Sequence, residues 1–178
     1  MKDNVFLEDQ KKFGLADYMN FDINGREHMG STVPLAVYRL LEYSVREELT
    51  ERFGREIQAD IFRCAGRRAG RFFAETMLDM TLSYHAFMAQ LQAQMAEMKI
   101  GVLRIEKYEE KTGKMVLTVS EDADCSGLPL LGEYVCNFDE GFIAEILSIY
   151  TGKYYIAEEV DCWATGDRVC RFCAEIKE

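Results

Sequence analysis

The sequence has few basic residues and no long apolar run. Its 21 lysines and arginines stand against 31 acidic residues, a net charge of −10. Nucleic-acid binders and proteins of anionic membrane surfaces depend on basic residues, so neither partner is expected. No run of about 18 apolar residues exists, and the N-terminus lacks the apolar core of a signal peptide, so we expect no membrane span and a cytoplasmic protein.

Residues that usually carry catalysis are also scarce. The chain has two histidines, His28 and His85, and neither lies near another candidate for acid–base or nucleophilic chemistry. It has no P-loop and no G-x-G-x-x-G after a strand, so a nucleotide or nicotinamide has no obvious site. The sequence favours a binding protein over an enzyme, without deciding between them.

Only two prolines occur, and no low-complexity stretch or repeat interrupts the chain. A length of 178 residues with 48% hydrophobic residues suits one domain with a sizeable core. Residues 1–30 show weak periodicity and several turn formers, which predict an extension with a short hairpin around Asn24-Gly25. Residues 31–178 form the predicted domain.

Helical spacing of apolar residues predicts helices over residues 31–54, 55–78, 83–98 and 137–150. Ser31 or Thr32 is the expected cap of the first, and Asn137 with Glu140 resembles a capping box opening the last, which should stop at Gly152. The expected buried stripe of the first helix is Leu35, Tyr38, Leu41, Val45 and Leu49. The expected stripe of the second is Ile57, Ile61, Cys64, Ala65 and Phe72.

The second predicted helix has one side almost without side chains, because Gly66, Gly70 and Ala74 lie four residues apart. This bare side either packs closely against another helix, which we favour, or leaves room for a ligand. A second face carries Arg63, Arg67 and Arg71. We expect these arginines to form a solvated face rather than an anion site.

A period of two predicts strands over residues 100–107, 115–120, 154–162 and 169–176. The order along the chain is helices, a hairpin, a helix and a second hairpin. This order predicts an α+β fold, a four-stranded antiparallel sheet with helices packed on it.

Five of the six cysteines crowd into the last third of the chain. In a reducing compartment such cysteines are seldom structural disulfides. If the last hairpin centres on Gly166, Cys162 lies opposite Cys170, with Cβ atoms about 4.5–5.5 Å apart. Both sulfurs can then reach one metal ion, and Cys136, just before the last helix, can swing toward them.

Strand parity sets two further candidates apart. Cys173 lies three residues beyond Cys170, so a regular strand points it to the opposite face. Glu159 has the same offset from Cys162 and joins the site only if the strand bulges near Val160-Asp161. A disulfide between Cys162 and Cys170 and unliganded core thiols are the alternatives to the favoured metal site, and Cys64 is expected in the core.

The residues Glu159 to Phe172, EVDCWATGDRVCRF, resemble the end of the vinyl-4-reductase domain, also called a predicted hydrocarbon-binding domain. The resemblance continues upstream through Cys125-Ser126-Gly127 and residues 136–142, CNFDEGF, and covers about residues 33–175. It implies a ligand-binding fold like that of nitric-oxide signalling domains and of Golgi-transport subunits.

Related phenol-sensing domains hold zinc with three cysteines and a glutamate. Their spacing, C-x22-E-x2-C-x7-C, falls here on Cys136, Glu159, Cys162 and Cys170. Cys125 is common in the vinyl-4-reductase group, so a four-cysteine site with Cys125 in place of Glu159 stays open. Four protein ligands close the coordination of zinc, which makes the expected Zn²⁺ structural. The histidine and tryptophan that grip phenol in those sensors have no clear counterparts here.

The favoured function is binding of a small apolar or aromatic, hydrocarbon-like molecule as sensor or carrier. A homodimer interface or a separate partner would pass on the signal. Alternatives are a vinyl reductase of a tetrapyrrole (a chlorophyll precursor) or its substrate-carrying subunit, and an assembly scaffold. The expected pocket, between helices and sheet, is lined by Phe72, Phe73, Met77, Phe87, Met88 and Phe142.

Overall fold

The computed structural model describes residues 14–19 and 32–177, and the chain divides into two compact units, Met1–Val33 and Pro34–Glu178. The described part of the first unit holds one short helix, α1 (Leu15–Tyr18). The hairpin predicted around Asn24-Gly25 lies outside the described residues. The division at residue 30 into an extension and a domain stays a prediction.

The second unit has the predicted α+β architecture. Its strands form one antiparallel sheet in the order β1-β2-β4-β3. The helices are α2 (Leu35–Phe53), α3 (Arg55–Met77), α4 (Tyr84–Glu97) and α5 (Asn137–Thr151). The strands are β1 (Val102–Glu109), β2 (Lys114–Ser120), β3 (Tyr155–Asp161) and β4 (Cys170–Ile176), and a 3-10 helix, η2 (Trp163–Thr165), lies between the last two.

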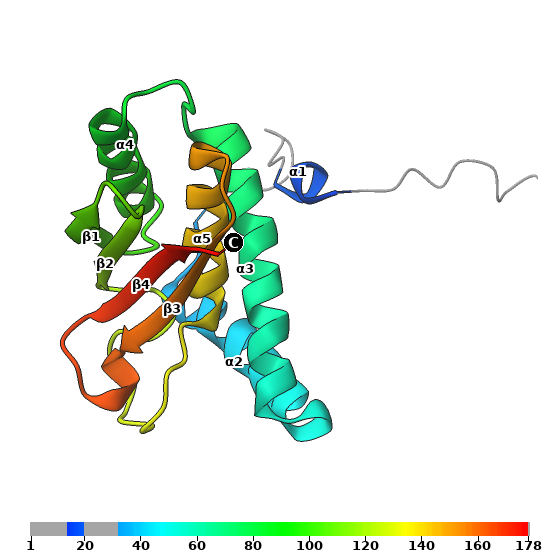
Figure 1. Ribbon diagram of the computed structural model, residues 1–178. Helices are drawn as coiled ribbons and strands as arrows, with labels where there is room; N and C mark the ends of the chain where they lie inside the picture. Colours follow the sequence, from blue (N-terminus) through cyan, green and yellow to red (C-terminus); the bar gives the residue numbers. More distant parts are fainter. Residues whose placement is uncertain (1–13, 20–31, 178) are drawn as a thin grey trace, which may run out of the picture. The chain divides into compact units, whose positions relative to one another are not determined.

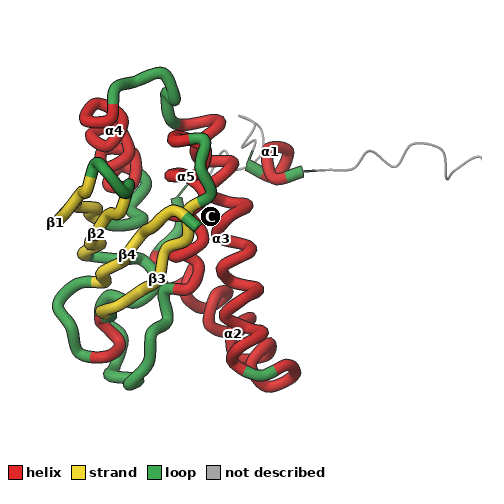
Figure 2. Tube along the Cα trace, viewed as in Figure 1, coloured by secondary structure: helices red, strands yellow, loops and turns green. Residues whose placement is uncertain are grey.

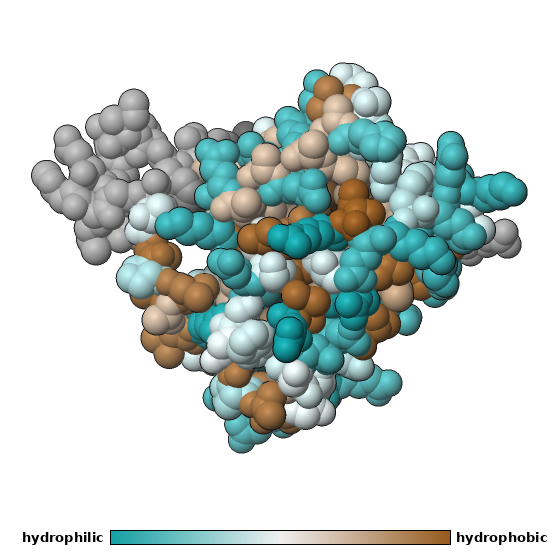
Figure 3. Space-filling model, turned by 90° about the vertical axis from the view of Figure 1, so that its left-hand side faces the viewer, coloured by the Kyte–Doolittle hydropathy of each residue, from teal (hydrophilic) through white to brown (hydrophobic). Residues whose placement is uncertain are grey.

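Helices cover one face of the sheet, as Figures 1 and 2 show, with α5 between the sheet and α3. Leu117 of β2 pairs with Phe172 of β4, and both side chains are buried in the core together with Phe87 of α4 and Ile146 of α5. The face of the molecule shown in Figure 3 carries hydrophobic residues in small groups separated by hydrophilic ones. The core therefore lies between the sheet and its helices.

The α3–α5 contact explains the bare side of α3. A Cβ atom on Gly66 would overlap the backbone carbonyl oxygen of Phe138, and one on Gly70 would lie 2.5 Å from that of Phe142. On the facing helix, a Cβ atom on Gly141 would overlap the carbonyl oxygen of Arg63. Only glycine allows two helix backbones to approach this closely. The expectation of close packing is confirmed, and a helix rather than a ligand fills this side.

The three arginines of α3 do not form the predicted solvated face. Arg63 Nε donates to Glu140 at 2.6 Å, and Arg67 Nη1 donates to Glu145 at 2.9 Å. Arg71 also pairs with Glu145. These arginines pair with acidic residues of α5, at the edge of the glycine contact, because α3 lies so close to that helix.

The predicted apolar stripes of α2 and α3 are wrong. On α2, Leu41 is 69% and Val45 43% exposed, whereas Glu42 and Arg46 are buried, because the inner side of this helix meets polar loops rather than the core. On α3, Cys64 is exposed, which overturns its assignment to the core. The helix turns its glycines inward, and the stripe that begins with Ile57 and Ile61 consequently faces outward.

Two predicted helix caps are also wrong, although the predicted stop is confirmed. Pro34, not Ser31 or Thr32, precedes the first turn of α2, and Cys136, not Asn137, precedes that of α5. The Glu140 carboxylate accepts a hydrogen bond from the backbone N–H of Glu159 in β3 instead of capping its own helix. Gly152 ends α5 in the left-handed conformation that favours glycine, with φ +69°.

Candidate functional site: a four-cysteine centre and an adjoining cleft

Four buried thiols meet where the last third of the chain folds together. Cys125 comes from the loop after β2, Cys136 from the start of α5, Cys162 from the end of β3 and Cys170 from the start of β4. Each side chain is at most 1% exposed, and the four sulfurs lie within 4.8 Å of one another. The Sγ–Sγ distances are 3.0 Å for Cys125–Cys170, 3.5 Å for Cys136–Cys170 and 3.9 Å for Cys136–Cys162.

The last hairpin places two of these thiols side by side. Asp161 pairs with Arg171, so the strands lead Cys162 and Cys170 into the same turn. The turn is closed by its own polar groups: the Asp167 N–H donates to the Cys162 carbonyl at 3.1 Å, and the Thr165 hydroxyl donates to the same carbonyl at 2.8 Å. Local chain geometry thus presents both sulfurs before any metal binds.

Helix α2 holds the loop that carries Cys125. Arg39 Nε donates to the Ala123 carbonyl, and an Arg39 Nη2 hydrogen bond reaches the Ser126 carbonyl, each at 2.7 Å. The Tyr43 hydroxyl donates to the Asp124 carbonyl at 3.0 Å. These bonds surround Cys125, which explains why the inner side of α2 is polar.

Glu159 lies beside the thiols but outside the group of four. The sheet register shifts between Glu159 and Asp161, the bulge that the parity argument required, and Glu159 is buried. One carboxylate oxygen accepts the Cys136 N–H at 3.0 Å, and the other is buried without a partner. Burial, with a smaller effect of the Cys162 charge, raises the pKa of Glu159 to about 9.

Cys173 belongs to the outer face of the sheet, as strand parity predicts. It pairs with Glu158 of β3 and Val116 of β2, and its thiol is half-buried. Among the described residues, the cysteine group that can hold a metal comprises Cys125, Cys136, Cys162 and Cys170.

The geometry of the four thiols fits a single tetrahedral ion. A Zn–S distance of about 2.3 Å requires sulfurs about 3.8 Å apart, and the recorded separations of 3.0–3.9 Å need only a small expansion to reach it. Hydrogen bonds from the other thiols, led by Cys125, lower the pKa of Cys162, whereas those same contacts and burial raise the pKa of Cys136. One thiolate is thus favoured without a metal, and a dication would favour the rest.

Buried acidic residues surround the thiols, and sequence reasoning missed them. Asp122, Asp124 and Asp139 are each at most 5% exposed, and a carboxylate oxygen of Asp122 and one of Asp139 group with the Cys136 sulfur. Burial and the charge of Asp122 raise the pKa of Asp139 well above its usual range. The acidic alternation directly before Cys125 was the available signal.

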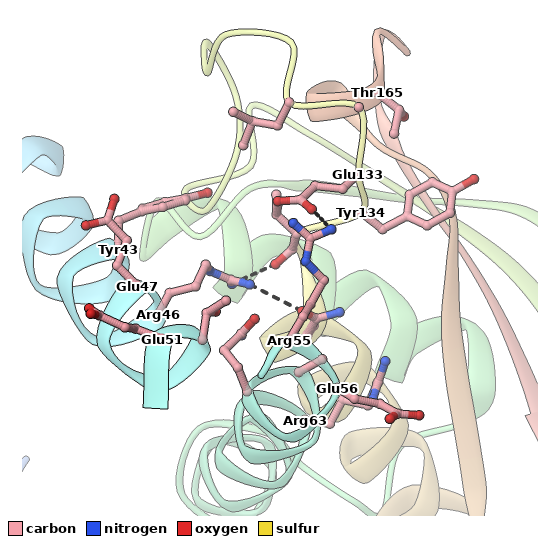
Figure 4. Close-up of a pocket in the computed structure, with 17 residues that line it drawn as sticks. Tyr43, Arg46, Glu47, Glu51, Arg55, Glu56, Arg63, Glu133, Tyr134 and Thr165 are labelled. Carbon is pink, nitrogen blue, oxygen red and sulfur yellow. Dashed lines mark hydrogen bonds and ion pairs between the residues drawn. The ribbon is translucent and has the colours of Figure 1, made fainter. Parts of the chain in front are cut away.

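An open cleft of about 1060 Å³ adjoins this centre, between α2, the start of α3 and the loop of residues 131–137. Figure 4 shows the Arg46 guanidinium reaching into it from α2, and Arg55 pairing with Glu133 across it. Arg46 Nη2 donates to the Val135 carbonyl at 2.7 Å, and Nη1 donates to Asn137 Oδ1 at 3.2 Å. These partners flank Cys136, so the cleft and the thiol centre share a wall.

The six residues predicted to line an interior pocket pack mainly against one another and their neighbours. The Phe87 ring stacks on Tyr150 at 3.8 Å, and Phe73 meets Phe142 edge-to-face at 5.2 Å. The residues buried in the core cluster are Phe73, Phe87, Met88 and Phe142, with Phe72 and Met77 half-buried. None of the six lines the cleft of Figure 4.

The sheet, its helices and the buried thiols define a small α+β domain, and comparison with known proteins identifies its type. Residues 115–176 match the vinyl-4-reductase (V-4-R) domain, so the chain carries this domain over the segment that supplies all four thiols. The resemblance to the vinyl-4-reductase family is confirmed.

Two uncharacterized proteins of Methanocaldococcus jannaschii are similar in sequence. MJ0150 is 28% identical over 150 residues, which cover 84% of this chain and 80% of that protein. MJ1642 is 36% identical over 77 residues, 43% of this chain and 45% of that protein, so the match spans less than half of its length.

Solved structures share the fold at low sequence identity. The phenol-responsive sensory domain of the transcription activator PoxR, solved with phenol, matches with a TM-score of 0.64 and 15% identity over 83% of this chain and 76% of that one. A vinyl-4-reductase family protein from Methanocaldococcus jannaschii gives 0.52 and 14% over 84% and 85%. Trafficking protein particle complex subunit 3 from Naegleria fowleri, covalently bound to palmitic acid, gives 0.61 and 14% over 81% and 95%.

These likenesses confirm the predicted fold class. Among the described residues, no helix is long and apolar enough to cross a membrane.

Proposed function

We propose that the chain is a cytoplasmic protein that binds a small apolar or aromatic molecule as sensor or carrier, and that a structural zinc ion braces it. The observation that carries this proposal is that one segment both matches the vinyl-4-reductase domain and brings four buried thiols together. The likeness in fold to a sensory domain solved with phenol supports a small-molecule ligand.

In this proposal Cys125, Cys136, Cys162 and Cys170 bind zinc, and Glu159 supports the site through the Cys136 N–H. Four thiolates and a dication leave a charge of −2, which the nearby Arg39 and Arg46 partly offset. All four positions around the ion are filled by protein, so the ion offers no place for a substrate and acts as a clamp. A set of Cys136, Glu159, Cys162 and Cys170 is the alternative.

The ligand site first proposed is the interior lined by Phe72, Phe73, Met77, Phe87, Met88 and Phe142. Since four of these side chains are buried in the core, a ligand there requires the helices to move away from the sheet. Signal transfer requires a second chain. The exposed apolar residues of α2, among them Leu40 at 71% and Leu41 at 69%, support a homodimer or a separate partner.

The same two observations, a filled core and an exposed apolar helix face, favour an assembly scaffold as the second candidate function. A scaffold would have a stable protein partner and no small ligand, whereas a sensor or carrier would hold a ligand.

Native mass spectrometry of gently purified protein, with metal analysis of the same sample, distinguishes the two. We expect each chain to carry one zinc ion and a fraction of chains to carry a co-bound small molecule. A protein that is consistently free of small molecules, in samples that retain the metal, would overturn the binding function and favour the scaffold.

A further inference from the structure

A buried arginine lines the cleft of Figure 4 with one donor left unpaired. Arg46 is 9% exposed, and its two terminal nitrogens bond Glu42, Val135 and Asn137. Its Nε atom, in contrast, is buried and has no hydrogen-bond partner. An unpaired buried donor costs about 1–3 kcal/mol, so this N–H is poised to accept a partner.

A second unpaired donor belongs to the facing helix. Gln58 of α3 also lines the cleft, is 3% exposed, and leaves its Nε2 amide without a partner. Among the described residues that line this cleft, the buried side-chain atoms without a partner are these two, and both are donors. A ligand group that only accepts hydrogen bonds therefore complements the cleft, as a carbonyl or carboxylate oxygen does.

The surroundings of Arg46 favour a ligand with an apolar or aromatic body. The guanidinium carbon lies 4.3 Å from the Phe62 ring centroid and 5.5 Å from that of Tyr43, so rings flank its plane while its Nε edge stays unpaired. Leu131, Tyr134 and other apolar groups complete the walls.

The charges around the cleft bear on how an anion would bind. Glu42 partly neutralises Arg46 at 3.1 Å. The lining also contains two more arginines and four acidic residues, which are Arg55, Arg63, Glu47, Glu51, Glu56 and Glu133. This acidic excess disfavours a carboxylate relative to a neutral carbonyl, while the Arg46 charge favours it, so the two groups compete closely.

We propose that this cleft is a ligand site for a small apolar or aromatic molecule bearing a carbonyl or carboxylate group, whose oxygen accepts hydrogen bonds from Arg46 and Gln58. The site rests on the proposed small-molecule function but lies apart from the interior lined by Phe72, Phe73, Met77, Phe87, Met88 and Phe142. Because Arg46 also bonds the residues on both sides of Cys136, an occupant bears directly on the wall shared with the thiol centre.

The test is a titration of the full, metal-loaded chain with three probes of similar size: acetophenone, benzoate and ethylbenzene. Isothermal calorimetry gives the affinity, and NMR follows the side-chain amide of Gln58. We expect acetophenone or benzoate to bind at least about tenfold more tightly than ethylbenzene and to shift the Gln58 amide resonances. The stronger of the two oxygen-bearing probes identifies the acceptor.

Matched variants assign the donors. Gln58→Leu keeps the side-chain volume and should weaken the preferred probe about 3- to 10-fold, as should Arg46→Lys, whereas Gln94→Leu on the exposed surface of α4 should not. If a variant fails to fold, the Gln58 resonances of the unmodified chain still decide the matter. Equal binding of ethylbenzene, or an unshifted Gln58 amide, would overturn the site. If native mass spectrometry still finds a co-bound molecule, the small-molecule function survives and only this location falls.

Discussion

The sulfur atoms of Cys125 and Cys170 lie 3.0 Å apart although 45 positions separate them in the chain. With Cys136 and Cys162 they join a loop, the first turn of α5 and the final hairpin at one buried point. Removing the ion that we propose there would leave four thiols and several acidic side chains packed without a counter-charge. The stability of the last third should therefore depend on that ion.

Cys125→Ser should lower the free energy of unfolding of the metal-loaded protein by more than about 3 kcal/mol, because it removes a ligand and leaves a hydroxyl in a dry site. Cys173→Ser is the matched control and should cost less than about 1 kcal/mol, since that thiol is outside the group. Denaturant unfolding with and without a chelator measures both. Equal losses for the two variants would contradict the clamp.

Gly66→Ala should destabilise the fold by about 3 kcal/mol or more. The added methyl group would overlap the backbone carbonyl of Phe138, and two helices cannot separate without losing the packing around them. Cys64→Ala, on the exposed side of α3, should change stability by less than about 0.5 kcal/mol. Thermal unfolding followed by circular dichroism compares them, and a harmless Gly66→Ala would refute the close contact.

Glu145→Gln should cost about 2 kcal/mol, because this nearly buried carboxylate receives both Arg67 and Arg71. Glu75→Gln is the control, since Glu75 is exposed and its pair with Arg71 is 3.6 Å long. That exposed pair should contribute close to nothing. The same loss for both variants, measured in urea, would show that the α3–α5 ion pairs add no specific stability.

The stability contributed by Glu42 should fall as pH rises. Burial, followed by the charge of Asp124, raises the pKa of Glu42 from 4.5 to about 7. A raised carboxyl pKa means that the folded state holds its proton more tightly, so the contribution is full below about pH 4.5 and is lost as pH rises through about 7. Glu42→Gln cannot titrate. Between pH 5 and pH 8 the wild type should lose up to about 3 kcal/mol relative to this variant.

Denaturant titrations at the two pH values make this comparison, and Glu48→Gln on the exposed side of α2 provides the reference. An identical pH dependence of the wild type and Glu42→Gln would mean that Glu42 titrates normally.

Periodicity predicted the elements well because their length and spacing are local properties. The four long helices and four strands were predicted within a few residues of their observed ends, and the antiparallel sheet followed from their order. Strand parity also placed Cys173 away from Cys170, because alternation along a strand requires no knowledge of the rest of the fold.

The orientations of the helices could not be predicted in the same way. Hydrophobic residues such as Leu41 and Ile57 indicated buried faces, but α2 buries the Glu42–Arg46 pair against polar loops, and α3 buries its glycines. Both choices depend on partners far along the chain, namely residues 122–137 for α2 and Gly141 for α3.

The candidate centre was predicted in part for a related reason. Spacing alone paired Cys162 with Cys170, and family resemblance supplied Cys136 and Glu159. The proximity of Cys125 depends on hydrogen bonds from Arg39 and other α2 side chains to its loop, which no local pattern reveals.

Metal content is the most direct test of the centre. Zinc per chain should be measured, after gel filtration in the presence of a weak chelator, for the wild type, Cys125→Ser and Glu159→Gln. Four-cysteine coordination predicts one zinc ion per chain in the wild type and in Glu159→Gln, and a large loss of zinc in Cys125→Ser. A full zinc content in Cys125→Ser together with its loss in Glu159→Gln would contradict the account and place Glu159 on the metal.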